Sequence, residues 1–152
     1  MLAAAPRPAS ISVPEGEKAV KVTLVLVWAS ARKEAEVSKR LESYRKLLER
    51  CAKKKFNSFV AEGKEQTSDI PEAKEGEFRL TKRYDLKLTP GRKDGKRRLK
   101  LRLYDKQKKK AGRFSYVRCD KPSAILTPER RQKDGRDEQL IVLLIYKSLK
   151  DE

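Results

Sequence analysis

Two segments near the ends of the sequence are apolar on both of their faces, and they constrain the fold more than any other feature. They read AVKVTLVLVWA at 19–29 and QLIVLLIYKSL at 139–149. A strand with two apolar faces has to be covered on both sides, because either face would otherwise lie in water. We therefore expect these two strands to lie side by side, or stacked one over the other, at the centre of the fold.

The segments between them alternate between apolar and polar residues, which is typical of half-buried strands. Such strands are predicted at 56–63, 77–90, 97–105 and 113–119, with a shorter one before the charged stretch 127–138. That stretch and residues 70–76 are predicted to be polar loops. Turns separate the alternating segments, so they are expected to pair as antiparallel hairpins that flank the two apolar strands.

One segment, about 32–54, has the apolar spacing of a helix. Its apolar stripe recurs every three or four residues and consists of Val37, Leu41, Tyr44, Leu48 and Cys51. The predicted fold class is therefore α+β: a mostly antiparallel β-sheet or sandwich of about six to seven strands, with one amphipathic helix after the first strand. Residues 1–17 are predicted to form an irregular arm, and residues 18–150 a single α+β domain.

The leucines between 84 and 103 limit how the two middle strands can pair. They must all share one face, because a slip of one residue would move every leucine of a strand into water. The simplest register places residue 88 opposite 99, 86 opposite 101 and 84 opposite 103. The opposite face then carries Lys87 beside Lys100, a repulsion that costs about a few tenths of a kcal/mol at an exposed site.

The charge of the chain is concentrated in one segment. The 152 residues include 39 Lys and Arg against 22 Asp and Glu, for a net charge of +17, and 79–113 alone contributes +13. Such an excess favours a polyanionic partner: DNA or RNA first, then anionic polysaccharide or lipid. A polar outer face is also required of any half-buried strand, but this face lacks the usual mixture of acids and bases. The predicted polyanion contacts are Lys87, Arg98, Lys100, Arg102, Lys108, Lys109 and Lys110.

Three aromatic residues lie in or just after the basic segment: Tyr104, Phe114 and Tyr116. Proteins that bind single-stranded nucleic acid stack bases on such side chains, which makes the three candidate stacking residues. Packing in the core or at a sheet edge is the simpler explanation for them. No zinc finger, helix-turn-helix or RNP-like motif accompanies them, so the sequence predicts no base specificity.

The sequence has no histidine, and this excludes most familiar catalytic arrangements. Ser-His-Asp and Cys-His sites and His-containing metal sites are ruled out. Neither GxxxxGK[ST] nor GxGxxG occurs, so no phosphate-binding glycine loop is indicated. We therefore expect no catalytic residues, no cofactor and no metal, and a protein that is not an enzyme. No apolar run is long enough to predict a transmembrane segment.

Two features bear on the compartment without deciding it. Cys51 and Cys119 are either two buried thiols or one disulfide formed in an oxidising compartment. Leu2–Ala5 is either the end of an export signal or part of an irregular leader in an intracellular protein. Both a cytoplasmic and a secreted or periplasmic location are therefore compatible with the sequence.

The order of the expected elements, together with the FNSF run at 56–59, resembles a family of uncharacterised, predicted secreted bacterial β-rich domains. The resemblance covers about residues 20–147 and implies neither an enzymatic activity nor any site residues. It supports a second functional hypothesis beside nucleic-acid binding. In that hypothesis the chain is a secreted or envelope-associated structural or assembly domain, which binds anionic surface polymers, lipid or an acidic protein partner.

Overall fold

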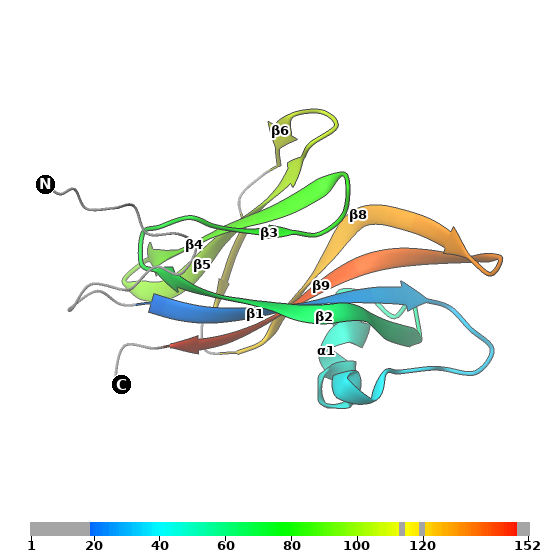
Figure 1. Ribbon diagram of the computed structural model, residues 1–152. Coiled ribbons are helices and arrows are strands. Elements are labelled where there is room, and N and C mark those ends of the chain that lie inside the picture. The colour runs from blue at the N-terminus through cyan, green and yellow to red at the C-terminus, as the bar shows by residue number, and fades with distance from the viewer. Residues whose placement is uncertain (1–18, 113–114, 119–120, 149–152) are drawn as a thin grey trace, which may run out of the picture.

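The computed structural model describes residues 19–112, 115–118 and 121–148, so the predicted arm at 1–17 lies outside the described residues. Within these residues, nine strands form two sheets, and a short helical segment follows the first strand (Figure 1). The predicted α+β class with a mostly antiparallel sheet or sandwich is confirmed. Within the described residues, no helix has the length and apolar character needed to cross a membrane.

The first sheet, called sheet A, contains the two strands that are apolar on both faces. β1 (Ala19–Ser30) and β9 (Arg136–Ser148) pair antiparallel at its centre, with Leu24 opposite Leu144 and Trp28 opposite Leu140. β2 (Ser58–Pro71) and β8 (Ser123–Lys133) flank them, which gives the order β2-β1-β9-β8. The expectation that the two apolar strands lie side by side at the centre is confirmed.

The second sheet, called sheet B, is built from the basic part of the chain. Its order is β3 (Gly76–Arg79), β4 (Tyr84–Lys93), β5 (Lys96–Asp105) and β6 (Lys110–Ala111), and β7 (Ser115–Arg118) also pairs with β5. Sheet B packs on one face of sheet A, and the core between them consists mainly of leucines and valines. Its buried members include Val22, Leu24, Leu86, Leu88, Leu99, Leu101, Leu140 and Val142.

A second core lies on the other face of sheet A, under the helical segment. A 3-10 helix, η1 (Lys39–Tyr44), continues into α1 (Arg45–Cys51). Leu41 and Leu48 are fully buried against Phe59 of β2. The remaining members of the predicted stripe pack partly buried around them, so the stripe is confirmed and both faces of β1 and β9 are covered.

The helical segment begins later than the predicted residue 32. Residues just before it run along the free edge of β2 instead: the Ser38 N–H donates to the Phe59 carbonyl over 2.9 Å, and the Phe59 N–H donates to the Glu36 carbonyl over 2.8 Å. The hydroxyl of Ser38 also accepts the Ala61 N–H at 2.9 Å. An edge strand exposes unpaired backbone groups, and these bonds satisfy some of them at the expense of the first helical turns.

Both predicted polar loops are wrong in part. The charged stretch 127–138 forms most of a hairpin, in which β8 and β9 are joined at Asp134 and Gly135, and β2 continues to Pro71. β8 and β2 are the edges of sheet A. Apolar alternation is weak in such strands because parts of both their faces lie in water, so their polar composition resembled that of a loop.

The predicted register of the middle hairpin is wrong by two residues, although its facing is right. Leu88 lies opposite Leu101 and Leu86 opposite Leu103, so the leucines still share the inner face. The turn decides the register: Asp94 and Gly95 connect the strands with φ of 55° and 76°. Two residues with positive φ form the tight type I′ hairpin turn, for which Asp-Gly is a favoured pair.

Candidate polyanion interface

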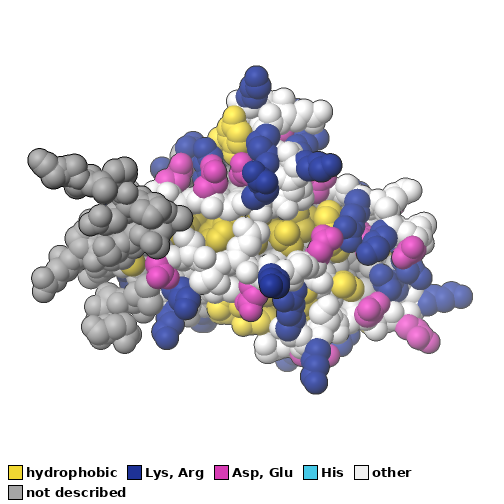
Figure 2. Space-filling model, in the orientation of Figure 1, with side chains coloured by type: hydrophobic (Ala, Val, Ile, Leu, Met, Phe, Trp, Pro, Cys, Tyr) yellow, Lys and Arg dark blue, Asp and Glu magenta, His cyan; other side chains and the backbone are white. Residues whose placement is uncertain are grey.

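The outer face of sheet B, turned away from the core, carries four of the seven predicted polyanion contacts. Because side chains alternate along a strand, the outward residues of β4 and β5 are those opposite in parity to the buried leucines. They include Lys87, Arg98, Lys100 and Arg102, each half-buried. Figure 2 shows Lys and Arg side chains gathered around the upper part of the molecule, where Figure 1 places sheet B, with acidic side chains among them.

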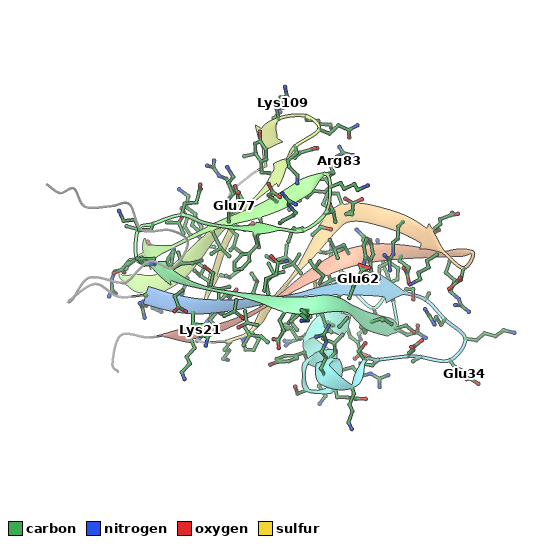
Figure 3. All side chains as sticks on the ribbon, viewed as in Figure 1. Lys21, Glu34, Glu62, Glu77, Arg83 and Lys109 are labelled. Carbon is green, nitrogen blue, oxygen red and sulfur yellow. The ribbon has the colours of Figure 1, made fainter. Side chains whose placement is uncertain are left out.

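One half of this outer face is neutralised by acids that precede β4 in the chain. Glu77 of β3 lies 3.6 Å from Lys87, and Glu75 of the β2–β3 loop lies 3.5 Å from Arg102. Figure 3 shows Glu77 on the ribbon of β3, at the edge of sheet B. We call this half the acid-paired edge. Lys87 and Arg102 lie directly opposite each other, so these acids also relieve the repulsion between them.

The other half of the outer face, formed by β5 and β7, has no acidic side chain among its described residues. Arg98 lies opposite Arg118, and Lys100 lies opposite Tyr116. On the β4 side, Arg98 faces Gly91, which offers no side chain, and Lys100 faces a threonine. We call the set Arg98, Lys100, Tyr116 and Arg118 the basic edge. Its two arginines stand directly across from each other, an arrangement that favours an external anion.

The three candidate stacking residues have different surroundings. Tyr116 is the exposed aromatic of the described chain, with 43% of its surface accessible, and it belongs to the basic edge. Tyr104 is half-buried, and the Lys87 ammonium lies 4.8 Å from the centre of its ring. Phe114 lies outside the described residues. The structure therefore favours Tyr116 as the aromatic that a flat ligand group can reach.

Lys108, Lys109 and Lys110 lie away from this face, around the turn between β5 and β6. All three are exposed, and Figure 3 shows Lys109 at the tip of the turn, pointing away from the body of the protein. Lys110 lies opposite Asp105, in the row of residues that shares the inner face with Tyr84. The seven predicted contacts are thus not one surface, because Lys110 lies on the opposite side of sheet B from Lys100.

The β5–β6 turn is held in shape by Asp105. Its carboxylate accepts two hydrogen bonds from the Arg83 guanidinium, at 2.8 and 3.1 Å. It also accepts the N–H groups of Gln107 and Lys108, at 3.0 and 3.2 Å. The bond from Arg83 lowers the pKa of Asp105 to about 2, and the backbone donors add to that effect. Lys108 therefore projects from a backbone that is fixed by a charged side chain.

An arginine also contacts an aromatic ring on sheet A, where its charge is already paired with acids of the same protein. The Arg131 guanidinium lies 4.0 Å from the centre of the Trp28 ring, and it pairs with Glu62 at 3.0 Å and with Glu138 at 2.7 Å. The Trp28 indole donates to Glu62 at 2.8 Å, and its ring is only 6% exposed. Every member of this cluster has its partner within the protein, so it stabilises sheet A rather than forming a binding surface.

Arg118 is not among the contacts predicted from the sequence, although the strand pattern could have identified it. The strand expected at 113–119 places Arg118 and Tyr116 on the same face, two residues apart. Their pairing with Arg98 and Lys100 depends on β7 lying beside β5, a contact between strands that alternation alone does not predict. The pairing of Glu75 and Glu77 with the basic strands is a tertiary contact of the same kind.

The cysteine at the end of α1 gives no sign of a functional thiol. Cys51 is free and half-buried, and burial raises the pKa of its thiol to about 11. Because Cys51 is free, the structure does not support the predicted alternative of a Cys51–Cys119 disulfide; Cys119 itself lies outside the described residues. Among the residues that the structure does describe, no three Cys, Asp or Glu side chains gather closely enough to hold a metal ion.

Comparison with protein-family models, curated proteins and solved structures gives no match for this chain. The resemblance to secreted bacterial β-rich domains therefore stays a prediction.

Proposed function

We propose that the protein is a non-enzymatic interaction module whose basic edge binds an extended polyanion, with nucleic acid as the first candidate. The observation that carries the proposal is the clustering of cations on the outer face of sheet B: Arg98 lies directly opposite Arg118, and Lys100 follows Arg98 on the same face of β5. Tyr116, with 43% of its surface accessible, lies opposite Lys100 within this cluster.

The spacing of these groups suits a charged polymer. Alternate residues of a strand place Arg98 and Lys100 about 6.6 Å apart along β5, and Arg118 lies one strand away, at about 4.8 Å. Backbone phosphates bind to such cations without regard to base sequence. Tyr116 offers a ring on which a base of a single strand can stack, a contact worth about 1–3 kcal/mol in other proteins.

The proposal is tested by removing the cations of the basic edge and measuring the salt dependence of binding. In the triple variant Arg98→Gln, Lys100→Gln, Arg118→Gln, three phosphate contacts are lost. For a fluorescein-labelled single-stranded oligonucleotide followed by anisotropy, the slope of log K against log salt should become shallower by about 2, since each contact contributes about 0.7.

The matched control removes three exposed cations from the helical segment: Lys39→Gln, Lys46→Gln and Arg50→Gln. These lie on the far side of sheet A from sheet B, so the net charge changes equally but the basic edge stays intact. The control should keep the slope of the unmodified protein. Equal losses in both triples would refute the basic edge as the site, and binding that does not respond to salt would refute the polyanion proposal.

A second pair of measurements separates the partner classes. Anionic vesicles and a sulfated polysaccharide are titrated under the same salt conditions as the oligonucleotide. Nucleic acid should bind most tightly, and Tyr116→Leu should weaken single-stranded binding without changing the salt slope, because stacking involves no counterion release. Tight binding of vesicles or polysaccharide without oligonucleotide binding would replace nucleic acid with an anionic envelope polymer.

A further inference from the structure

A pocket of about 290 Å³ lies under the β5–β6 hairpin, on the inner side of sheet B. Figure 1 shows this hairpin projecting past the body of the two sheets. The pocket is lined by Tyr84 and Leu103 from sheet B, by Pro128 from β8, and by the hairpin residues Asp105, Lys108, Lys110, Ala111 and Gly112.

The strand register explains why these groups meet. Tyr84 lies opposite Asp105, and Asp105 lies opposite Lys110, so all three side chains belong to one inward row. In the next row, the Gly112 N–H donates to the Leu103 carbonyl at 2.8 Å. The absence of a side chain at Gly112 leaves space beside Leu103. The pocket therefore has an apolar floor, with two lysines beside its opening.

Both walls of the pocket are fixed before any ligand arrives. On the hairpin side, Asp105 is bound to Arg83 and to two N–H groups of the turn. On the β8 side, the irregular segment around Pro128 is held by hydrogen bonds from Gln139 to the Thr127 carbonyl and from Thr127 to the Leu140 carbonyl, at 2.7 and 2.9 Å. Preformed walls of this kind are typical of small-molecule sites.

The chemistry of the lining selects the ligand. The Asp105 carboxylate is paired with Arg83. The net charge at the opening of the pocket is therefore determined by the ammonium groups of Lys108 and Lys110, which favour an anion. The Tyr84 ring, the Leu103 side chain and the Pro128 ring favour a flat, weakly polar group. A nucleotide combines an anionic phosphate with a flat, weakly polar base.

We propose that this pocket binds one unpaired nucleotide, with its base against Tyr84, Leu103 and Pro128 and its phosphate at Lys108 and Lys110. The inference extends the proposed function from phosphate contact to recognition of an unpaired base. It follows that single strands, loops and strand ends bind better than continuous duplex, because a paired base must first be unstacked at a cost of about a few kcal/mol.

The test uses adenosine 5′-monophosphate, ribose 5-phosphate and inorganic phosphate as separate probes, with binding followed by NMR chemical shifts at low salt. Gly112→Leu fills the pocket without a charge change, and its Cβ meets only the Leu103 carbonyl at an ordinary 3.5 Å. Adenosine monophosphate should bind more tightly than ribose 5-phosphate and phosphate, and Gly112→Leu should weaken it at least tenfold.

Lys110→Gln and Lys109→Gln form a matched pair, because both lysines are exposed neighbours in the sequence but only Lys110 lines the pocket. Lys110→Gln should weaken adenosine monophosphate binding about three- to tenfold, and Lys109→Gln should leave it within twofold. Since Lys110 is exposed, this pair also tests the proposal if Gly112→Leu melts at a much lower temperature. Equal binding of all three probes, or equal effects of the two lysine variants, would overturn the proposal.

The result is distinguishable from a failure of the proposed function. The basic-edge triple variant leaves every pocket residue in place, so it should still bind adenosine monophosphate while its oligonucleotide salt slope falls. Conversely, Gly112→Leu should keep the salt slope for duplex DNA. A pocket that binds the mononucleotide in a protein without salt-dependent polymer binding would refute the basic edge and leave the pocket standing.

Discussion

Removing the two acids of the acid-paired edge should make the protein bind polyanions more tightly. Glu75→Gln and Glu77→Gln release Arg102 and Lys87 from their ion pairs while keeping side chains of similar size. Both cations adjoin the basic edge on β5, so the cationic surface should widen across β4. This perturbation adds binding capacity without adding a single basic residue.

The geometry sets the size of both expected effects. The ion pairs are long, at 3.6 and 3.5 Å, and their acids are 57% and 44% exposed, so each contributes about 0.2–1 kcal/mol to stability. Adding a few tenths of a kcal/mol for the repulsion between Lys87 and Arg102 gives a total loss below about 2.5 kcal/mol. Two additional phosphate contacts would steepen the salt slope for duplex DNA by about 1.8.

The assay compares salt titrations of the double variant with those of a control double variant, Glu34→Gln and Glu65→Gln. These exposed acids make the same charge change elsewhere, Glu34 in the loop after β1 and Glu65 on β2. Only the Glu75/Glu77 variant should bind with a steeper slope. A slope unchanged from that of the unmodified protein, in a variant that melts cooperatively, would refute the idea that these acids mask part of a binding surface.

Three further predictions concern the fold that supports these surfaces. Gly95→Ala should destabilise the protein by about 1–2 kcal/mol in urea unfolding, because φ there is 76°, whereas Gly91→Ala, which meets no atom within 4 Å, should be neutral or stabilising. Leu48→Ala should cost about 2–5 kcal/mol by the same measurement, since the side chain is fully buried between α1 and sheet A. The contribution of Asp105 should be present above about pH 4 and lost as the pH falls through 2, because its folded pKa is about 2, below the value near 3.9 of an unfolded chain. Asp105→Asn should therefore lower the melting temperature at pH 7 and leave it nearly unchanged at pH 2.

The architecture was predictable where apolar residues dominate. β1 and β9 are apolar on both faces because sheet B covers one face and the helical segment covers the other, and this requirement is visible in their residues alone. The helical stripe around Leu41 and Leu48 was predictable for the same reason. Its starting residue was not, because hydrogen bonds between Ser38 and β2 decide it, and these join residues about 20 positions apart.

The register error has a different origin. Matching leucine to leucine fixed which face each strand buries, but it left every shift of two residues open, since such a shift preserves the facing. Asp94 and Gly95 contained the missing information, because that pair favours a two-residue turn and a two-residue turn permits a single register. For hairpins of this type, turn chemistry is the stronger guide to register, and leucine matching is the stronger guide to facing.

The candidate site was only partly predictable because charge along a strand says nothing about what lies across it. Lys87 and Arg102 were expected to contribute in the same way as Arg98 and Lys100, yet Glu77 on the neighbouring strand β3 and Glu75 just before it pair with the first two. The basic edge exists because β7 brings an arginine and a tyrosine beside β5. Neighbouring strands, more than composition, determine which cations can meet a ligand.

Side chains alternate in direction along β5, so its odd-numbered and even-numbered residues lie on opposite faces of sheet B. Leu99 and Leu101 are buried in the core, and the next inward residue along the strand, Leu103, reaches the pocket under the hairpin. Arg98 and Lys100 point outward to the basic edge. Substitutions at the even positions should therefore change the salt slope with little effect on stability, whereas substitutions at Leu99 and Leu101 should change stability first. A shift of register by one residue would exchange the two sets of positions, and the Asp94–Gly95 turn that prevents such a shift thus maintains both the core and the proposed binding surface.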